Sequence, residues 1–71
     1  MAIKITLDKQ ADAAYIYLKE IAAGEVAKTI SLNESLNVDL DLKGQILGIE
    51  ILDASINLPI NTAKSAEIIG I

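Results

Sequence analysis

Apolar and polar residues alternate in several short stretches, with the two-residue period of a half-buried strand. Residues 3–8 set Ile, Ile and Leu against Lys, Thr and Asp, and residues 26–32 repeat the pattern, with Lys28 interrupting the apolar side. DKQAD at 8–12 and LNES at 32–35 carry the polar residues that favour turns. We therefore expect two strands here, each followed by a turn.

The clearest alternation runs from Leu36 to Ile51, on both sides of Gly44. It predicts a β-hairpin in which six aliphatic side chains share one face: Leu36 opposite Ile51, Val38 opposite Ile49 and Leu40 opposite Leu47. A two-residue turn at Lys43 and Gly44 gives this register, and so does a four-residue loop from Leu42 to Gln45. A slip by one residue would bury acidic side chains, so the hydrophobic pattern selects this register.

The same hairpin has the spacing of an EF-hand calcium loop, with Asp39 first, Asp41 third and Glu50 twelfth. Such a loop needs an oxygen ligand at its fifth place and a helix on each side, whereas here Lys43 takes that place and the flanks are strands. We therefore expect no calcium loop. The three carboxylates share a polar face in the predicted hairpin. They are weak candidates for a loosely held cation, and a solvated acidic face is the simpler interpretation.

Two other segments are open to alternatives. Residues 11–24 place apolar side chains along a helical stripe, yet the run Tyr-Ile-Tyr-Leu within them also suits a strand. Beyond Pro59, one prediction is a short helix that is capped by Asn61 or Thr62 and ends at Ile69, and the other is a last strand.

Composition favours self-association. The 71 residues make one small domain, which buries only roughly 60% of its unfolded surface. The chain has neither Cys nor His to support that core with disulfides or zinc, and 52% of its residues are apolar. We therefore expect a homodimer or a higher oligomer. The predicted interface residues lie in the apolar tail: Ile56, Leu58, Ile60, Ile68, Ile69 and Ile71. The competing prediction is that this tail folds back onto its own core.

Charge narrows the range of partners. The net charge is −4 and the chain has six Lys and no Arg, so we expect no direct contact with nucleic acid. The N-terminal MAIKITLDK lacks the apolar segment of a signal peptide, and no run of ~18 apolar residues is long enough to cross a membrane. We expect a cytoplasmic protein with no membrane partner, and a basic protein suits its acidic surface.

Two sequence blocks resemble a known family. The first is DKQADAAYIYL at 8–18 and the second is GQILGIEILDAS at 44–55. Their matching residues are Asp8, Ala11, Asp12, Tyr15, Ile16, Gly44, Gly48, Ile49, Glu50, Ile51, Leu52, Ala54 and Ser55. The order and spacing are similar to those of domain of unknown function 2283, a family of uncharacterised prokaryotic proteins. The resemblance implies a glycine-turned hairpin and a strand from Tyr15 to Leu18, and it brings no activity, cofactor or catalytic residue.

The chain departs from this family pattern at two places, with Leu7 where a Tyr is common and with a longer apolar tail. The patterns together predict a single domain over residues 1–71, of the mainly β or α+β class. We expect an antiparallel β-meander of about five strands with a short C-terminal helix or turn. Residues 1–55 form the sheet that resembles the family, and residues 56–71 form the apolar tail.

Catalysis is not expected, because without His or Cys few groups could act as nucleophile, acid or base: Asp8, Asp12, Tyr15, Tyr17, Glu50, Asp53 and Ser55. Most of these have a structural explanation. Asp8 can close an Asx-turn and Asp12 can cap the returning strand. Asp53 with Ser55 can cap whatever follows the last strand, and the two tyrosines can pack with their hydroxyls in water.

We therefore favour a non-enzymatic, self-associating interaction module without a cofactor, antitoxin-like toward a basic partner protein. The alternative is a module that binds a small ligand or a cation on an exposed acidic face. The surplus of apolar residues and the lack of an organised ligand set favour the first hypothesis.

Overall fold

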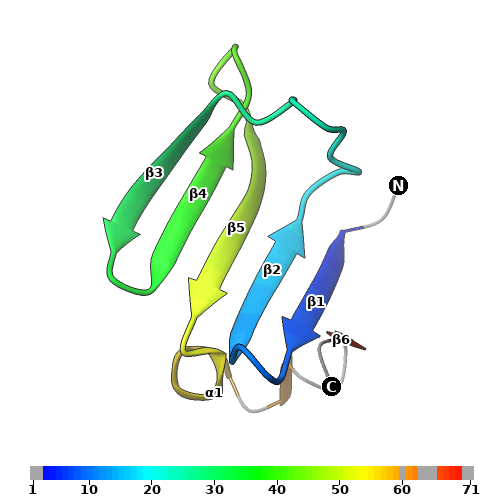
Figure 1. Ribbon diagram of the computed structural model, residues 1–71, viewed down its shortest axis with the longest axis vertical. Helices are drawn as coiled ribbons and strands as arrows, with labels where there is room; N and C mark the ends of the chain where they lie inside the picture. The colour runs from blue at the N-terminus through cyan, green and yellow to red at the C-terminus, as the bar shows by residue number, and fades with distance from the viewer. Residues whose placement is uncertain (1–2, 60, 63–65, 70–71) are drawn as a thin grey trace.

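Six strands form one sheet in the computed structural model, which describes residues 3–59, 61–62 and 66–69 (Figure 1). The strands are β1 (Lys4–Asp8), β2 (Ala13–Tyr17), β3 (Lys28–Asn33), β4 (Leu36–Leu40), β5 (Ile46–Leu52) and β6 (Glu67–Ile69), and the helix α1 spans Ala54–Asn57. The order across the sheet is β3-β4-β5-β2-β1-β6. Strands β1 to β5 pair antiparallel, and β6 adds to β1 in parallel.

The predicted fold class is confirmed: five antiparallel strands and a short helix near the C-terminus. The strand order departs from a simple meander at one point, because β5 and not β3 lies beside β2. The chain from residue 18 to residue 27 therefore crosses the end of the sheet to reach β3, which Figure 1 shows along the upper edge of the view. None of the helices in the described part of the chain has the length and apolar character that crossing a membrane requires.

The strand registers give the sheet two unlike faces. On one, the apolar face, direct partners line up as an aliphatic row across five strands: Ile5, Ile16, Ile49, Val38 and Ile30. A second row on that face consists of Leu7, Ala14, Ile51 and Leu36. The polar face carries the alternate residues: Lys4, Tyr17, Gly48, Asp39 and Thr29 in one row, and Thr6, Tyr15, Glu50, Asn37 and Ser31 in the next.

A buried cluster lies where α1 packs against the apolar face, and Leu47, nearer the hairpin loop on β5, is buried outside this cluster. Ala14 and Ile51 of the second row are buried together with Ala54 of the helix, and Leu58 packs against this cluster. Figure 1 shows α1 at the lower end of the sheet, directly beyond β5. Because α1 has only four residues, it covers this end of the face and leaves the aliphatic row outside the buried cluster.

The predicted hairpin register is confirmed over most of its length and wrong at its tip. Leu36 pairs with Ile51 and Val38 with Ile49, as predicted, but Leu40 pairs with Ile46 and not with Leu47. A register shift, which leaves one extra residue in β5, causes the change. The loop runs from Asp41 to Gln45, so neither the two-residue turn nor the four-residue loop forms.

Asp41 accounts for this longer loop. Its Oδ1 accepts the backbone N–H groups of Lys43 and Gln45, both at 2.9 Å, and its own N–H donates to the Gln45 carbonyl at 3.0 Å. Gly44 supplies the positive φ of 82° that the loop requires. Local hydrogen bonds to one carboxylate therefore select the loop, and the extra residue is absorbed in the strand.

The two open segments are now assigned. Strand β2 covers Ala13 to Tyr17, which confirms the strand that the family resemblance implies. The tail ends in a strand, β6, so the alternative helix to Ile69 is wrong, and the helix of the fold lies earlier, at α1. The β6 segment pairs with β1, which gives the end of the tail a place in the sheet.

The predicted interface residues of the tail have different environments. Ile56 on α1 is 81% exposed, whereas Leu58 packs against the core of its own chain. The backbones of Ile68 and Ile69 belong to β6. Ile60 and Ile71 lie outside the described residues. In Leu58 and β6 the tail folds back onto its own chain, as the competing prediction proposed.

Candidate functional site

The polar face is built around Tyr15, whose ring lies across Gly48 of the neighbouring strand β5. A Cβ atom added to Gly48 would come within 2.3 Å of Tyr15 Cε1 and 2.5 Å of its hydroxyl oxygen. Gly48 has no such atom, so the ring can lie flat over the backbone of β5 and extend toward β4. The glycine inside this strand is therefore required by the tyrosine that covers it.

The hydroxyl of Tyr15 is bound to an aspartate on the far side of that glycine. It donates to Asp39 Oδ2 at 2.5 Å, and the hydroxyl of Thr29 donates to Asp39 Oδ1 at 2.5 Å. Burial of the ring, and after it the hydrogen bond to Asp39, raises the pKa of Tyr15 above its usual value. The expectation that both tyrosine hydroxyls lie in water is thus wrong for Tyr15, because its ring reaches a carboxylate two strands away.

The rest of the polar face extends this arrangement toward β1. The rings of Tyr15 and Tyr17 lie with their centroids 4.6 Å apart, and Lys4 Nζ lies 5.6 Å from the centroid of the Tyr17 ring. Such ring pairs and cation–π contacts stabilise a sheet across its strands. This face therefore joins β1, β2, β5, β4 and β3 through side chains as well as through the backbone.

The three weak cation candidates do not come together as a ligand set. Asp39 binds Tyr15 as described, Glu50 Oε1 accepts the side-chain amide of Asn37 at 2.9 Å, and Asp41 holds the hairpin loop. The prediction that Asp41 lies on the polar face with the other two is wrong, because its carboxylate turns to backbone N–H groups of the loop. Among the described residues no three His, Cys, Asp or Glu side chains are grouped so that they could hold a metal ion.

A second cluster lies at the end of the sheet, where Asp12 holds the start of α1. Its Oδ1 accepts the backbone N–H of Ser55 at 3.0 Å, its Oδ2 accepts the Ser55 hydroxyl at 2.7 Å, and its carbonyl accepts the N–H of Ala54 at 2.9 Å. Asp53 stands at the N-cap position but makes no side-chain capping bond. We expected Asp53 with Ser55 to cap this helix. The side chain that caps it is instead that of Asp12, which lies 43 residues from Ser55 in sequence.

This cluster borders a hollow but has the chemistry of a cap. The hollow has a volume of about 420 Å³ and is lined by Leu7, Lys9, Asp12, Ala54, Ser55, Leu58 and Pro59. Both carboxylate oxygens of Asp12 already accept hydrogen bonds from Ser55, and a carboxylate is a weak base for a serine hydroxyl. The arrangement fixes α1 against the sheet. Asp8 has a similar local role, since its Oδ1 accepts the N–H groups of Gln10 and Ala11, which confirms the predicted Asx-turn.

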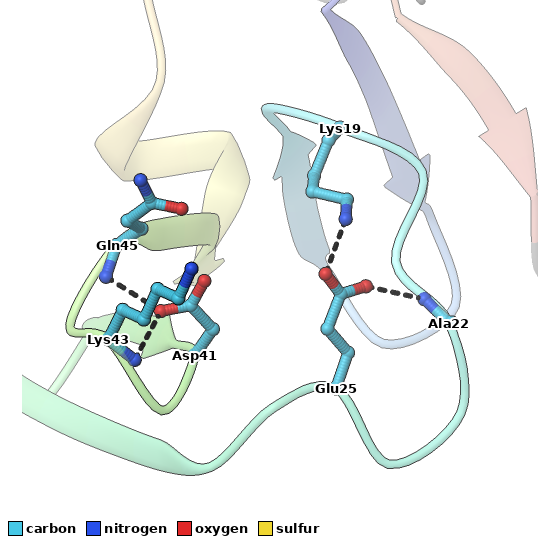
Figure 2. A network of polar contacts seen from close by, with 6 residues as sticks. All are labelled: Lys19, Ala22, Glu25, Asp41, Lys43 and Gln45. Atoms are coloured by element: carbon cyan, nitrogen blue, oxygen red, sulfur yellow. Dashed lines mark hydrogen bonds and ion pairs between the residues drawn. The ribbon is translucent and has the colours of Figure 1, made fainter.

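Carboxylates in the loops at the opposite end of the sheet are also used locally, as Figure 2 shows. Glu25 accepts a hydrogen bond from Lys19 and, at 2.9 Å, from the backbone N–H of Ala22. These two donors, Lys19 first, lower the pKa of the Glu25 carboxyl. Its loop and the Asp41 loop border one hollow, and each acidic side chain there is turned to its own loop.

Sequence reasoning selected the residues of these clusters but missed how they are paired. Tyr15, Asp39, Asp12 and Ser55 were all candidates, yet the pairs Tyr15–Asp39 and Asp12–Ser55 join segments far apart in the chain. Gly48 carried a usable signal, because a glycine inside a strand often marks a close approach by another group. Of the side-chain nitrogen and oxygen atoms buried within the described residues, none lacks a hydrogen-bond partner.

Comparisons with known proteins agree with the family resemblance of the two sequence blocks. No curated protein and no solved structure matches the chain. The family model described as "Protein of unknown function (DUF2283)" matches residues 4–55, a span that includes β1 to β5 and both polar clusters. Because the match covers most of its length, the chain belongs to that family.

Proposed function

We propose that the protein is a non-enzymatic interaction module that self-associates and that binds a basic protein as its second partner. The observation that carries this proposal is the small size of the core. Among the described residues, the buried apolar side chains are those of Ala14, Leu47, Ile51 and Ala54. A chain that is 52% apolar and buries so little as a monomer gains stability by covering the remaining apolar surface with another protein.

The polar clusters support a structural and not a catalytic use of the acidic residues. Asp39, Glu50 and Asp12 each accept hydrogen bonds from side chains of neighbouring segments, and Asp41 and Glu25 hold their own loops. Groups committed in this way have little freedom to move protons for a substrate. The same commitments weigh against the acidic face as a cation site.

The second partner follows from charge. At a net charge of −4 with no Arg, the surface attracts a positively charged protein and steers its approach. A short acidic protein of this kind suits an antitoxin-like role, in which it binds and neutralises a basic partner.

Light scattering on the full chain tests self-association. We expect a dimer or a higher oligomer at micromolar concentration, and a monomer at that concentration would contradict the proposal. Co-purification with the protein encoded beside its gene tests the second partner. A basic neighbour should form a complex that dissociates as the salt concentration rises, because screening weakens contacts between opposite charges. If the neighbouring protein is acidic or does not bind, the antitoxin-like part of the proposal is wrong.

A further inference from the structure

We propose that the apolar face of the sheet packs against the apolar face of a second copy of this chain, with the aliphatic row at the centre of the contact. This inference rests on the proposed self-association and assigns it a surface and a geometry. It differs from the sequence-based prediction, which placed the interface in the tail.

The burial of the two apolar rows shows which surface is incomplete. In the row beside α1, Ala14 is 3% exposed and Ile51 is 7% exposed, whereas Leu7 and Leu36 at its ends are half-buried. In the aliphatic row, Ile5, Ile16, Val38 and Ile49 are only half-buried and Ile30 is 38% exposed. The two rows belong to the same strands. Ala54 of α1 forms the buried cluster with Ala14 and Ile51 of the second row, whereas Ile16 and Ile49 of the aliphatic row only border that cluster. Within the described part of the chain, the aliphatic row lacks a second layer of the kind that a packed domain provides.

The solvent-accessible surface of the chain is larger than that of a compact monomer of the same mass. The chain exposes 4991 Å², whereas a compact monomer of its 7.6 kDa mass exposes roughly 4,300 Å². The excess of about 700 Å² is close to the ~800 Å² that each partner contributes to a standard interface. This excess belongs to the whole chain, and the aliphatic row contributes part of it. Its size is nevertheless that of the surface that one stable protein contact buries.

The chemistry of the face favours a second copy as the occupant. All five residues of the aliphatic row are Ile or Val, and Lys28 stands at the rim, on the outermost strand β3. Such a face offers nothing to a charged peptide, but it is complementary to another flat aliphatic face at the ~10 Å spacing of packed sheets. The polar face of the sheet remains outside this contact.

A symmetric dimer that uses the whole aliphatic row has Ile49 at its centre. Ile49 is the middle residue of the aliphatic row, with two residues on either side. A two-fold axis in the plane between the sheets, passing over β5, brings this row onto its own copy. Ile49 then contacts the same residue of the second copy, and Ile5 and Ile30 lie at the two ends of the interface.

Lysine substitutions at the two ends of the row test this assignment. Ile5→Lys and Ile30→Lys each place two like charges at the interface of a symmetric dimer, which should weaken it at least roughly tenfold. Ser31→Lys is the matched control, because it adds the same charge on the same strand as Ile30 but on the polar face. Light scattering over a dilution series measures the dimer dissociation constant, and circular dichroism checks that each variant is folded.

Dissociation by both row variants, with the control unchanged, is the result that we expect. A dimer that survives both variants would overturn this inference and leave self-association standing. An effect of Ile30→Lys alone would also overturn it, since that pattern points to pairing through the edge of β3. A monomeric unmodified chain would refute both proposals.

A measurement without substitution keeps the test decisive if a variant unfolds. In a mixture of isotope-labelled and unlabelled chains, NMR should detect contacts between Ile49 methyl groups of different copies. Intermolecular contacts confined to other residues would place the interface elsewhere and contradict the inference.

Discussion

The two faces of the sheet differ in how completely a single chain satisfies them. On the polar face each of the three central acidic and aromatic groups has a partner within the chain, as Tyr15 has Asp39 and Glu50 has Asn37. On the apolar face Ala14 and Ile51 are buried under α1, whereas the row centred on Ile49 is only half-buried. Directional polar contacts can be completed within a single layer, whereas apolar burial needs a second layer. One face is thus completed by contacts within the chain, and the other is the surface at which we propose that a second copy binds.

Substitution of Gly48 by Ala should have the largest effect, because it breaks the polar face at its tightest contact. The new Cβ would lie 2.3 Å from Tyr15 Cε1, so the ring must leave and its bond to Asp39 is lost. We expect unfolding in urea to show that the free energy of unfolding falls by about 2–3 kcal/mol. In a Tyr15→Ala background the same substitution should have little effect, since the methyl group then has room. Equal losses in both backgrounds would show that ring contact is not the reason for glycine.

Loss of the Asp12 cap should loosen the attachment of α1 to the apolar face. Asp12→Ala removes both side-chain bonds to Ser55 that hold α1 over the second apolar row. We expect the free energy of unfolding to fall by about 1–2 kcal/mol. Ser55→Ala should lower it less, because the bond from the Ser55 backbone N–H to Asp12 remains. Hydrogen exchange of the Ala54 and Ser55 amides should quicken in Asp12→Ala. Unchanged exchange there would contradict the capping role.

Tyr15→Phe keeps the ring and removes only the hydrogen bond to Asp39. We expect the free energy of unfolding to fall by about 1 kcal/mol. Because the pKa of Tyr15 is raised in the folded chain, the unfolded chain loses this proton first as the pH rises past about 10. The stabilisation from Tyr15 is therefore complete below that pH and is lost above it. In Tyr17→Phe, Tyr15 is the only tyrosine. Its ultraviolet ionisation change should come well above pH 10, and a change at the usual pH in the folded chain would refute the buried bond.

The smallest effect should come from the rim. Lys4 pairs with Glu67 of β6 at 3.1 Å, but their side chains are 52% and 59% exposed. Solvent screens such a pair, so Glu67→Gln, which leaves Lys4 beside the Tyr17 ring, should change the free energy of unfolding by no more than ~0.5 kcal/mol. Thermal melts at low and at 0.5 M salt check this. A larger loss would show that β6 depends on charge more than on its pairing with β1.

The apolar pattern was enough to predict β1, β3 and most of the hairpin, whereas the strand at β2 was predicted from the family resemblance. Six aliphatic residues select the register that pairs Val38 with Ile49, and no other register buries them together. The pattern could not predict the loop, because the carboxylate of Asp41 competes for backbone N–H groups and moves the pairing of Leu40 by one residue. Local polar bonds of this kind leave no trace in hydrophobic periodicity.

Long-range pairing was the other limit. Nothing in the alternation indicates that β5 lies beside β2, and from that neighbour relation follow both the contact of Tyr15 with Gly48 and the cap of Asp12 on Ser55. The environment of one predicted interface residue in the tail also depends on long-range packing. Leu58 looked surplus in the sequence, but the fold brings it against Ala14 and Ile51. Surplus apolar area was evident from composition, whereas its position on the sheet required the registers.

Thermal unfolding over a hundredfold range of protein concentration tests most directly whether the apolar face is completed by association. If the second copy binds only the folded chain, mass action stabilises that chain, and Tm should rise steadily with concentration. Ile5→Lys should remove most of this rise. A Tm that is independent of concentration, in a chain that unfolds reversibly, would show that the monomer satisfies both faces by itself and would contradict the account.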